Sequence, residues 1–340
     1  MKKAIALALS LVMALSLVAC AKEEAPAASA PAAPSAPAAS APAAAPSAES
    51  IDVTLATGGT SGTYYAVGGV LSTVLSEKLA LSDINVISTG ASKANVYEVT
   101  DGNAQMSILQ SDVLTYAHAG TDLFAEDGAD TNSQWVAGLY NETVQIIATT
   151  DITDIAQLKG KAVCVGDVGS GTEFNAKQVL EAYGMTFDDI NKVNGSFADG
   201  VESIKDGKIA AAFTVAGAPT TAIVDLAATN DFNMLSLSDD AVKYLTTTYP
   251  FLVQENLPAG TYDGIDYEVV CVAVKAVMVA SKDLSEDVVY ELTKTMFENQ
   301  AELANGHAKF ELLSAENAVA GASVDIHPGA LKYYQEVGAL

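Results

Sequence analysis

The stretch Ile51-Asp52-Val53-Thr54-Leu55-Ala56-Thr57-Gly58-Gly59-Thr60-Ser61-Gly62-Thr63-Tyr64-Tyr65-Ala66-Val67 decides the fold. Its first part, Ile51–Thr57, is apolar and β-branched and predicts a strand, and Tyr64–Leu79 predicts the helix that follows. Glycine and hydroxyl residues fill the turn between them. A strand, a glycine-rich turn and a helix in this order are typical of an α/β sheet with helices on its faces.

The same alternation continues along the chain and restarts near Ile155, which predicts two similarly wound lobes. Before the restart we expect strands at Ile84–Ser88, Met106–Leu109, Gln134–Leu139 and Thr143–Thr149, and helices at Ser92–Asp101 and Asp112–Ala119. After it we expect helices at Ile155–Leu158, Glu173–Tyr183, Gly200–Lys205 and Thr220–Ala228, and strands at Ala162–Val165, Ala210–Val215 and Met234–Leu237. Beyond Pro250 and Pro258 we expect a strand at Val269–Ala280 and helices at Ser285–Asn305 and Leu331–Gly338. We place lobe one at residues 51–145, lobe two at 146–258, and a return to lobe one at 259–340.

The N-terminus has the pattern of a secretion signal. Lys2 and Lys3 precede an apolar run over residues 4–18, which is too short for a membrane-spanning helix. The run closes on Leu17-Val18-Ala19-Cys20, which resembles a bacterial lipobox. We therefore predict a signal peptide over residues 1–19 and a lipid anchor on Cys20, although Cys20 could also be an incidental cysteine. Residues 20–50, rich in Ala, Pro and Ser, predict an extended tether.

The charge of the chain excludes several partners. The formal net charge is -25, and loss of Lys2 and Lys3 with the signal would take it to about -27. Nucleic acid and anionic lipid surfaces are therefore not expected partners. The chain contains no arginine, so no guanidinium can clamp a carboxylate. An anionic ligand must be held by backbone N–H groups, hydroxyls, amides or a lysine.

Two further cysteines lie in apolar runs that predict buried strands. They are Cys164, within Ala162–Val165, and Cys271, within Val269–Val279. An oxidising compartment permits a disulfide between them. Buried free thiols are an equally good interpretation.

Four short segments rich in Gly and hydroxyl residues follow predicted strands and lead into helices: Thr57–Thr63, Gln110–Asp112, Gly169–Thr172 and Ala216–Pro219. Each one alone could be an ordinary turn or helix cap. In open α/β sheets, however, ligands bind at the carboxyl ends of the strands, and helix N-termini present free N–H groups to an anion. Because each lobe supplies two of these segments, we expect them to face one another across a ligand-binding cleft.

The residues that we expect to hold the ligand come from both lobes. We predict no cofactor and no metal at this site. Lobe one contributes Gly59, Thr60, Tyr64, Ser92, Gln110 and Ser111, and lobe two contributes Ser170, Gly171, Thr172 and Gly217.

Signals for an enzyme are weak. The chain has no Gly-x-Ser-x-Gly elbow, no phosphate-binding loop and no paired Cys or His spacing for zinc. Its three histidines, His118, His307 and His327, have positions that suit surface, cap and turn roles. We therefore predict a binding protein that is not an enzyme, with a surface hydrolase as a remote alternative.

The chain resembles the TAXI family, the extracytoplasmic receptors of certain tripartite ATP-independent periplasmic (TRAP) transporters. The resemblance spans the mature domain. Its motifs are Thr57-Gly58-Gly59 with Gly62–Tyr65, Ser88–Ser92 with Asn95, Gln110-Ser111-Asp112, Leu158–Lys161, Gly169–Glu173, Asp206-Gly207 with Ala211–Phe213, Pro258–Tyr262, and His327–Ala330 with Tyr333-Tyr334.

The resemblance implies a type II periplasmic-binding-protein fold with a hinge between lobes, and a TRAP-type permease as membrane partner. It also implies a small carboxylate as ligand, such as glutamate, a related amino acid or a dicarboxylate. The chain departs from the family where Leu139–Glu142 replaces a Tyr-Pro-Glu turn, and in its lack of arginine, which favours a zwitterion or monocarboxylate. A sensor lipoprotein that reports to a signalling receptor is the alternative function, since it would use the same fold.

Overall fold

The computed structural model describes residues 52–79 and 83–340, which belong to one compact unit. The expected signal peptide at 1–19, the lipid anchor at Cys20 and the tether at 20–50 lie outside the described residues. Within the described residues the strands form one sheet. They are β1 (Val53–Ala56), β2 (Ile84–Ile87), β3 (Met106–Gln110), β4 (Ser133–Ala148), β5 (Ala162–Cys164), β6 (Asn191–Val193), β7 (Ala211–Ala216), β8 (Asn233–Met234), β9 (Val253–Gln254) and β10 (Val272–Ser281).

The strand order is β2-β1-β3-β10-β4-β7-β5-β6, with β8 beside β4 and β9 beside β10. Strand β1 is parallel to β2 and β3, and β5 is parallel to β6 and β7. The two central strands, β4 and β10, are antiparallel to each other and to their outer neighbours. We call the half with β2, β1 and β3 the first lobe and the half with β7, β5 and β6 the second lobe.

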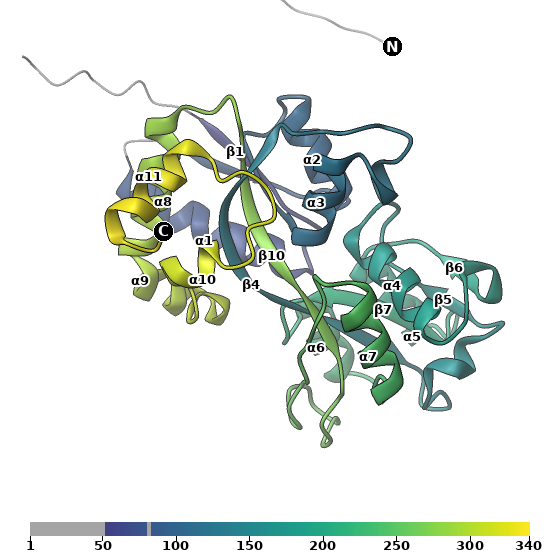
Figure 1. Ribbon diagram of the computed structural model, residues 1–340. Coiled ribbons are helices and arrows are strands. Elements are labelled where there is room, and N and C mark those ends of the chain that lie inside the picture. The colour runs from purple at the N-terminus through teal and green to yellow at the C-terminus, as the bar shows by residue number, and fades with distance from the viewer. Residues whose placement is uncertain (1–51, 80–82) are drawn as a thin grey trace, which may run out of the picture. The chain divides into compact units, whose positions relative to one another are not determined.

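Strands β4 and β10 run from one lobe into the other, side by side (Figure 1). Two separate strands were expected at Gln134–Leu139 and Thr143–Thr149, and this expectation is wrong: β4 is continuous through Glu142. Its middle pairs with β10, with Tyr140 opposite Ala276 and Asn141 opposite Lys275. Backbone pairing on β10 therefore carries the chain straight through the polar residues that suggested a turn.

Helices cover both faces of the first lobe's sheet. One face packs on α1 (Thr63–Lys78), α8, α9, α10 and α11 in a core that includes Val67, Leu71 and Tyr334. The other face packs on α2 and α3 in a core around Leu109 and Trp135. The remaining bounds are α2 (Ser92–Thr100), α3 (Ser111–Ala119), η1 (Asp122–Phe124), α8 (Glu286–Glu298), α9 (Gln300–Gly306), η4 (Ala308–Phe310), α10 (Ala315–Val319) and α11 (Pro328–Val337).

The second lobe repeats this three-layer arrangement. One face of its sheet packs on α4 and α7 around Phe213, and the other packs on α5 and α6 around Ile223. The bounds here are η2 (Ile155–Leu158), α4 (Gly171–Ala182), η3 (Phe187–Asp189), α5 (Phe197–Lys205), α6 (Thr221–Ala227) and α7 (Asp239–Thr248). The fold is therefore α/β with two lobes, each a sheet flanked by helices, as the sequence predicted.

The second-lobe core extends beyond Pro258. Tyr262, Ile265, Val269 and Cys271 pack in the same cluster as Ile223. The chain thus returns to the first lobe along β10. The lobe boundaries at 51–145, 146–258 and 259–340 stay a prediction.

Several element predictions need correction. The expected strand at Met234–Leu237 is only the two residues of β8, and the helix α7 was missed. The expected helix Ser285–Asn305 breaks at Asn299 into α8 and α9, because Asn299 leaves the helical conformation. Among the described residues, no helix has the length and hydropathy needed to cross a membrane.

Candidate functional site: a cavity between the lobes

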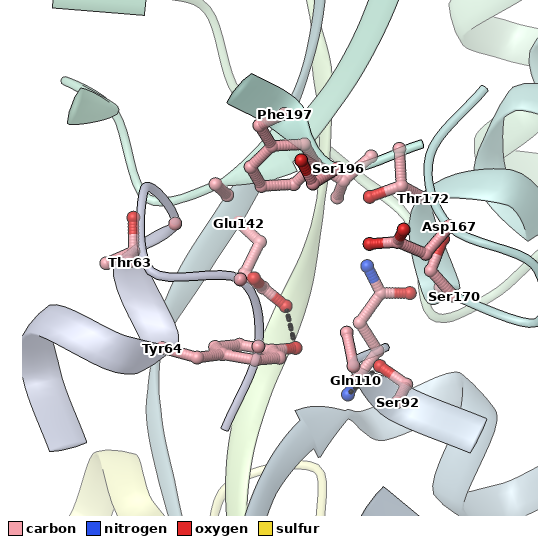
Figure 2. Close-up of a pocket in the computed structure, with 17 residues that line it drawn as sticks. Thr63, Tyr64, Ser92, Gln110, Glu142, Asp167, Ser170, Thr172, Ser196 and Phe197 are labelled. Carbon is pink, nitrogen blue, oxygen red and sulfur yellow. Dashed lines mark hydrogen bonds between the residues drawn. The ribbon is translucent and has the colours of Figure 1, made fainter. Parts of the chain in front are cut away.

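A cavity lies where the carboxyl ends of β1, β3, β5 and β7 meet. The space between its walls, including the open mouth, is about 490 Å³. Thr63 and Tyr64 lie on one side, and Asp167, Ser170 and Thr172 lie on the other (Figure 2). The lining residues are Gly58, Gly59, Gly62, Thr63, Tyr64, Ala91, Ser92, Gln110, Glu142, Asp167, Ser170, Gly171, Thr172, Ser196, Phe197, Val215 and Ala216.

Five helices begin at this cavity: α1, α2 and α3 from the first lobe, and α4 and α5 from the second. The N-termini of α4 and α5 are capped by the hydroxyls of Ser170 and Ser196. The N-termini of α1, α2 and α3 have no side-chain cap. The first-turn N–H groups of a helix lack intrahelical partners and carry partial positive charge. The first-lobe wall is therefore suited to bind an anionic group.

Asn95 holds the first-lobe loops in register. Its side-chain amide, which is fully buried, donates to the backbone oxygens of Thr57 (2.6 Å) and Ile108 (2.7 Å). The hydroxyl of Ser92 accepts a hydrogen bond from the backbone N–H of Gln110 (3.2 Å). These bonds tie the ends of β1 and β3 to the start of α2, so three helix N-termini share one wall.

A buried carboxyl group forms part of the cavity wall. Glu142, on β4, is only 2% exposed and accepts a hydrogen bond at Oε2 from the Tyr64 hydroxyl (2.6 Å; Figure 2). Burial raises the pKa of Glu142 well above its usual value, Asp112 adds to this rise, and the Tyr64 hydroxyl and Lys309 oppose it. Burial, together with Glu142, likewise raises the pKa of Tyr64. Burial of the pair therefore favours its neutral form.

The ionisable side chains that line the cavity are Tyr64, Glu142 and Asp167, and no described lysine or histidine is among them. Burial raises the pKa of Asp167, with a further contribution from Asp199. Gln110 is also buried, and its Oε1 has no hydrogen-bond partner. The cavity therefore combines two carboxyl groups, a free amide oxygen and uncapped helix N-termini.

The two lobes touch around the cavity. The Thr63 hydroxyl donates to the carbonyl oxygen of Gly217 (2.9 Å). A Cβ placed on Gly171 would lie 2.0 Å from Oε1 of Gln110, so only glycine permits this approach. The rings of Tyr116 and Phe174 meet edge to face across the lobes, 5.0 Å apart.

A polar contact also joins the two lobes. Asp112 accepts a hydrogen bond from Asn175 (3.4 Å), and both side chains are buried. Burial raises the pKa of Asp112 to about 6. The first and second lobes thus meet at a carboxyl group, that of Asp112, whose ionisation is costly.

Seven of the ten predicted ligand residues line the cavity and three do not. Thr60 is exposed in its turn, Ser111 is buried at the start of α3, and Gly217 faces Thr63 and Lys309. All ten assignments as ligand contacts stay predictions. The seven that line the cavity are Gly59, Tyr64, Ser92, Gln110, Ser170, Gly171 and Thr172.

Sequence reasoning missed Glu142, Asp167 and the start of α5. Glu142 was placed in a turn, yet it lies inside β4 opposite Val274. A charged residue within an otherwise apolar strand was the signal that could have found it. Asp167 follows β5 and Ser196 follows β6. In this region the sequence pointed only to the segment Gly169–Thr172 as a ligand-binding loop.

The other candidate groups have structural roles in the described residues. Cys164 and Cys271 are free, buried thiols in one hydrophobic cluster. His307 and His327 accept backbone hydrogen bonds as helix caps. No group of three or more metal-ligating side chains occurs in the described part of the chain.

Comparison with solved structures identifies the fold. A protein described as a periplasmic transporter aligns with 15% identity over 86% of this chain and 94% of its own, with a TM-score of 0.51. PhnD1 from Prochlorococcus marinus (MIT 9301), solved with methylphosphonate, aligns with 12% identity over 85% and 99%, with a TM-score of 0.50. A protein from Bordetella bronchiseptica RB50 aligns with 14% identity over 84% and 82%, with a TM-score of 0.50. The fold is that of the two-lobed periplasmic binding proteins.

The family follows from a direct sequence match. Residues 55–338 match the model of the NMT1-like family, and the chain belongs to this family. The match begins in β1 and ends just beyond α11, so it covers both lobes and all the residues that line the cavity.

Proposed function

We propose that this chain is an extracytoplasmic solute receptor that binds a small carboxylate in the cavity between its lobes and delivers it to a membrane transporter. The observation that carries the proposal is the convergence of five helix N-termini on one interlobe cavity, three of them without a side-chain cap. Such N-termini bind anions without an arginine. The solute contacts both lobes only when they meet, and it therefore favours the closed state.

The walls also limit the chemistry of the solute. No described lysine lines the cavity, so a second carboxylate would be buried there without a cation to pair with it. A zwitterion or a monocarboxylate is therefore favoured over a dicarboxylate. The structural neighbour PhnD1 was solved with methylphosphonate, which is also a small anion. That precedent is consistent with small-anion binding by this fold.

The remaining parts of the proposal concern the membrane. We propose that residues 1–19 are removed, that Cys20 carries a lipid, and that residues 20–50 tether the receptor to the membrane surface. The proposed partner is a TRAP-type permease, which the TAXI resemblance supports. Cys20→Ala should release the chain from the membrane fraction, and unaltered membrane retention of this variant would refute the anchor.

A thermal-shift screen of the purified chain tests solute binding. Amino acids, 2-oxo acids, monocarboxylates, dicarboxylates and short peptides are the probes. A solute that binds only the native state raises the melting temperature, by mass action. We expect a shift with a small carboxylate, and the variant Thr172→Ala should reduce it. Folded, solute-free protein that shifts with no probe would contradict the receptor function.

Uptake measurements test the permease. Membrane vesicles that contain the partner permease should accumulate the bound solute when an ion gradient is applied and no ATP is present. Uptake that requires ATP would contradict a TRAP partner. Binding without any uptake would favour the sensor alternative.

A further inference from the structure

The cavity holds a carboxyl group that solute capture by helix N-termini does not use. Glu142 is buried, and one oxygen accepts the Tyr64 hydroxyl. Among the described residues no donor reaches its other oxygen and no lysine forms an ion pair with it. A buried, unpaired carboxylate is costly, so the group keeps its proton in the solute-free receptor.

We propose that Glu142 recognises a protonated amine of the solute, and that binding displaces one proton from Glu142 to the solvent. This inference rests on the proposed receptor function and names its substrate class: a carboxylate that also carries an amine. The step is balanced, because the neutral carboxyl group and the alkylammonium ion become a carboxylate–ammonium pair and one proton enters water. No redox partner is needed.

The position of Glu142 suits this role. It lies on the crossing strand β4, between the lobes, whereas the uncapped N-termini of α1, α2 and α3 form the first-lobe wall. A solute with its carboxylate at these N-termini can direct an amine toward Glu142. Asp167, on the second lobe, adds another carboxyl group to the lining of the cavity.

The surroundings of Glu142 favour its neutral form until an amine arrives. Tyr64 on α1 donates to it, Asp112 on α3 disfavours its charge, and Tyr140 on its own strand is itself neutral and buried. Lys309 on η4 attracts its charge weakly and forms no ion pair with it. Burial raises the pKa of Glu142 most strongly. The ammonium group would supply the neighbouring positive charge that these groups do not.

The pH dependence of affinity tests the inference. Below the pKa of Glu142 in the solute-free receptor, an amine solute must displace a proton, so its Kd should fall about tenfold for each pH unit of increase. We would measure Kd by calorimetry between about pH 5 and pH 7, with the amino acid that gives the largest thermal shift and with its 2-oxo counterpart. Calorimetry in buffers of different ionisation enthalpy should show that about one proton is released for each amino-acid molecule bound.

Matched variants separate this effect from general charge effects. Glu142→Gln should remove the proton release and flatten the pH slope, and it should weaken amino-acid binding at least tenfold at neutral pH. Glu291→Gln, on the exposed face of α8, removes an equal charge outside the cavity and should retain the wild-type slope. A pH-independent Kd for a bound amino acid, or tighter binding of the 2-oxo acid, would overturn the inference.

A second measurement needs no solute. In the solute-free chain at neutral pH, carbon NMR or infrared difference spectra should show a neutral carboxylic acid that Glu142→Gln removes. Its absence would overturn the inference even if the receptor function held. If no solute bound but this signal were present, the proposed function would fail while the neutral state of Glu142 stood.

Discussion

Replacing Gly171 by alanine tests whether close approach of the lobes controls solute binding. A methyl group at this position would lie 2.0 Å from Oε1 of Gln110, where ordinary van der Waals contact begins at 3.4 Å. The two groups must separate by about 1.4 Å, the difference between these two values. Either Gln110 turns away from the cavity or α4 withdraws from α3.

The cost can be approximated from the contacts that would be lost. Withdrawal of α4 together with the rest of the second lobe breaks the hydrogen bond from Thr63 on α1 to Gly217 beyond β7, worth about 1 kcal/mol. It also separates Tyr116 from Phe174, worth about 1 kcal/mol. A total of about 2 kcal/mol corresponds to about a 30-fold lower population of the closed receptor, and Kd rises by the same factor.

Calorimetry of Gly171→Ala with the solute identified by thermal shift measures this change, and small-angle scattering should show a more extended solute-free chain. Gly69→Ala is the matched control, because its added methyl group in α1 meets no atom within 4 Å. That variant should bind normally and gain up to about 1 kcal/mol of stability. Wild-type affinity in Gly171→Ala would refute the reasoning, because it would show that the Gln110 side chain moves aside without any loss of binding free energy.

Three further substitutions probe the same region. Tyr64→Phe removes a buried hydrogen bond to Glu142 and should lower the free energy of unfolding by about 1–3 kcal/mol in urea titrations; a loss below about 0.5 kcal/mol would argue against that bond. Asp112 has a pKa raised to about 6 from 3.8, so its ionisation destabilises the fold as pH rises through this range. Asp112→Asn should therefore add at most about 3 kcal/mol at pH 7 and nothing below about pH 4, and an equal effect at both pH values would show that charge is not the cause. Thr63→Val removes one hydrogen bond between the lobes and should raise Kd about fivefold, mainly through faster dissociation in stopped-flow measurements; an unchanged dissociation rate would mean that this bond does not hold the lobes closed.

Most local elements of the fold could be predicted from the sequence. The strands and helices that begin at Val53, Thr63, Met106 and Ala162 lie within a few residues of their expected positions. Apolar periodicity and glycine turns depend on residues close together in the chain, so these elements can be identified without tertiary information.

The errors have a common cause in long-range packing. Asn141 and Glu142 lie where the TAXI resemblance implied a turn, between two predicted strands, but both belong to the one strand β4 and pair with β10. Helix α7 was missed because its threonine-rich end has low helix propensity, although Val242 and Leu245 bury against the second-lobe core. In both places tertiary contacts override the local preference.

The residues of the candidate site also fall into those with a local sequence signal and those without one. Strand–glycine–helix segments pointed to Gly59, Gln110 and Gly171, because glycine and helix starts are local signals. Glu142 had only the signal of a charged residue in an apolar stretch, and nothing near Glu142 or Asp167 in sequence shows that they face one cavity.

By itself the sequence determined the two-lobed α/β class, the absence of arginine at any anion site, and the loops that can present helix N-termini. Only the tertiary structure decided which of those loops share a cavity, that Glu142 forms its wall with Tyr64, and that the lobes meet through Gly171. The physical reason is the range of the interactions. Turn and helix signals act within a few residues, whereas the pairing of β4 with β10 joins groups far apart in the chain. The burial that results raises the pKa of the carboxyl group of Glu142 between the lobes.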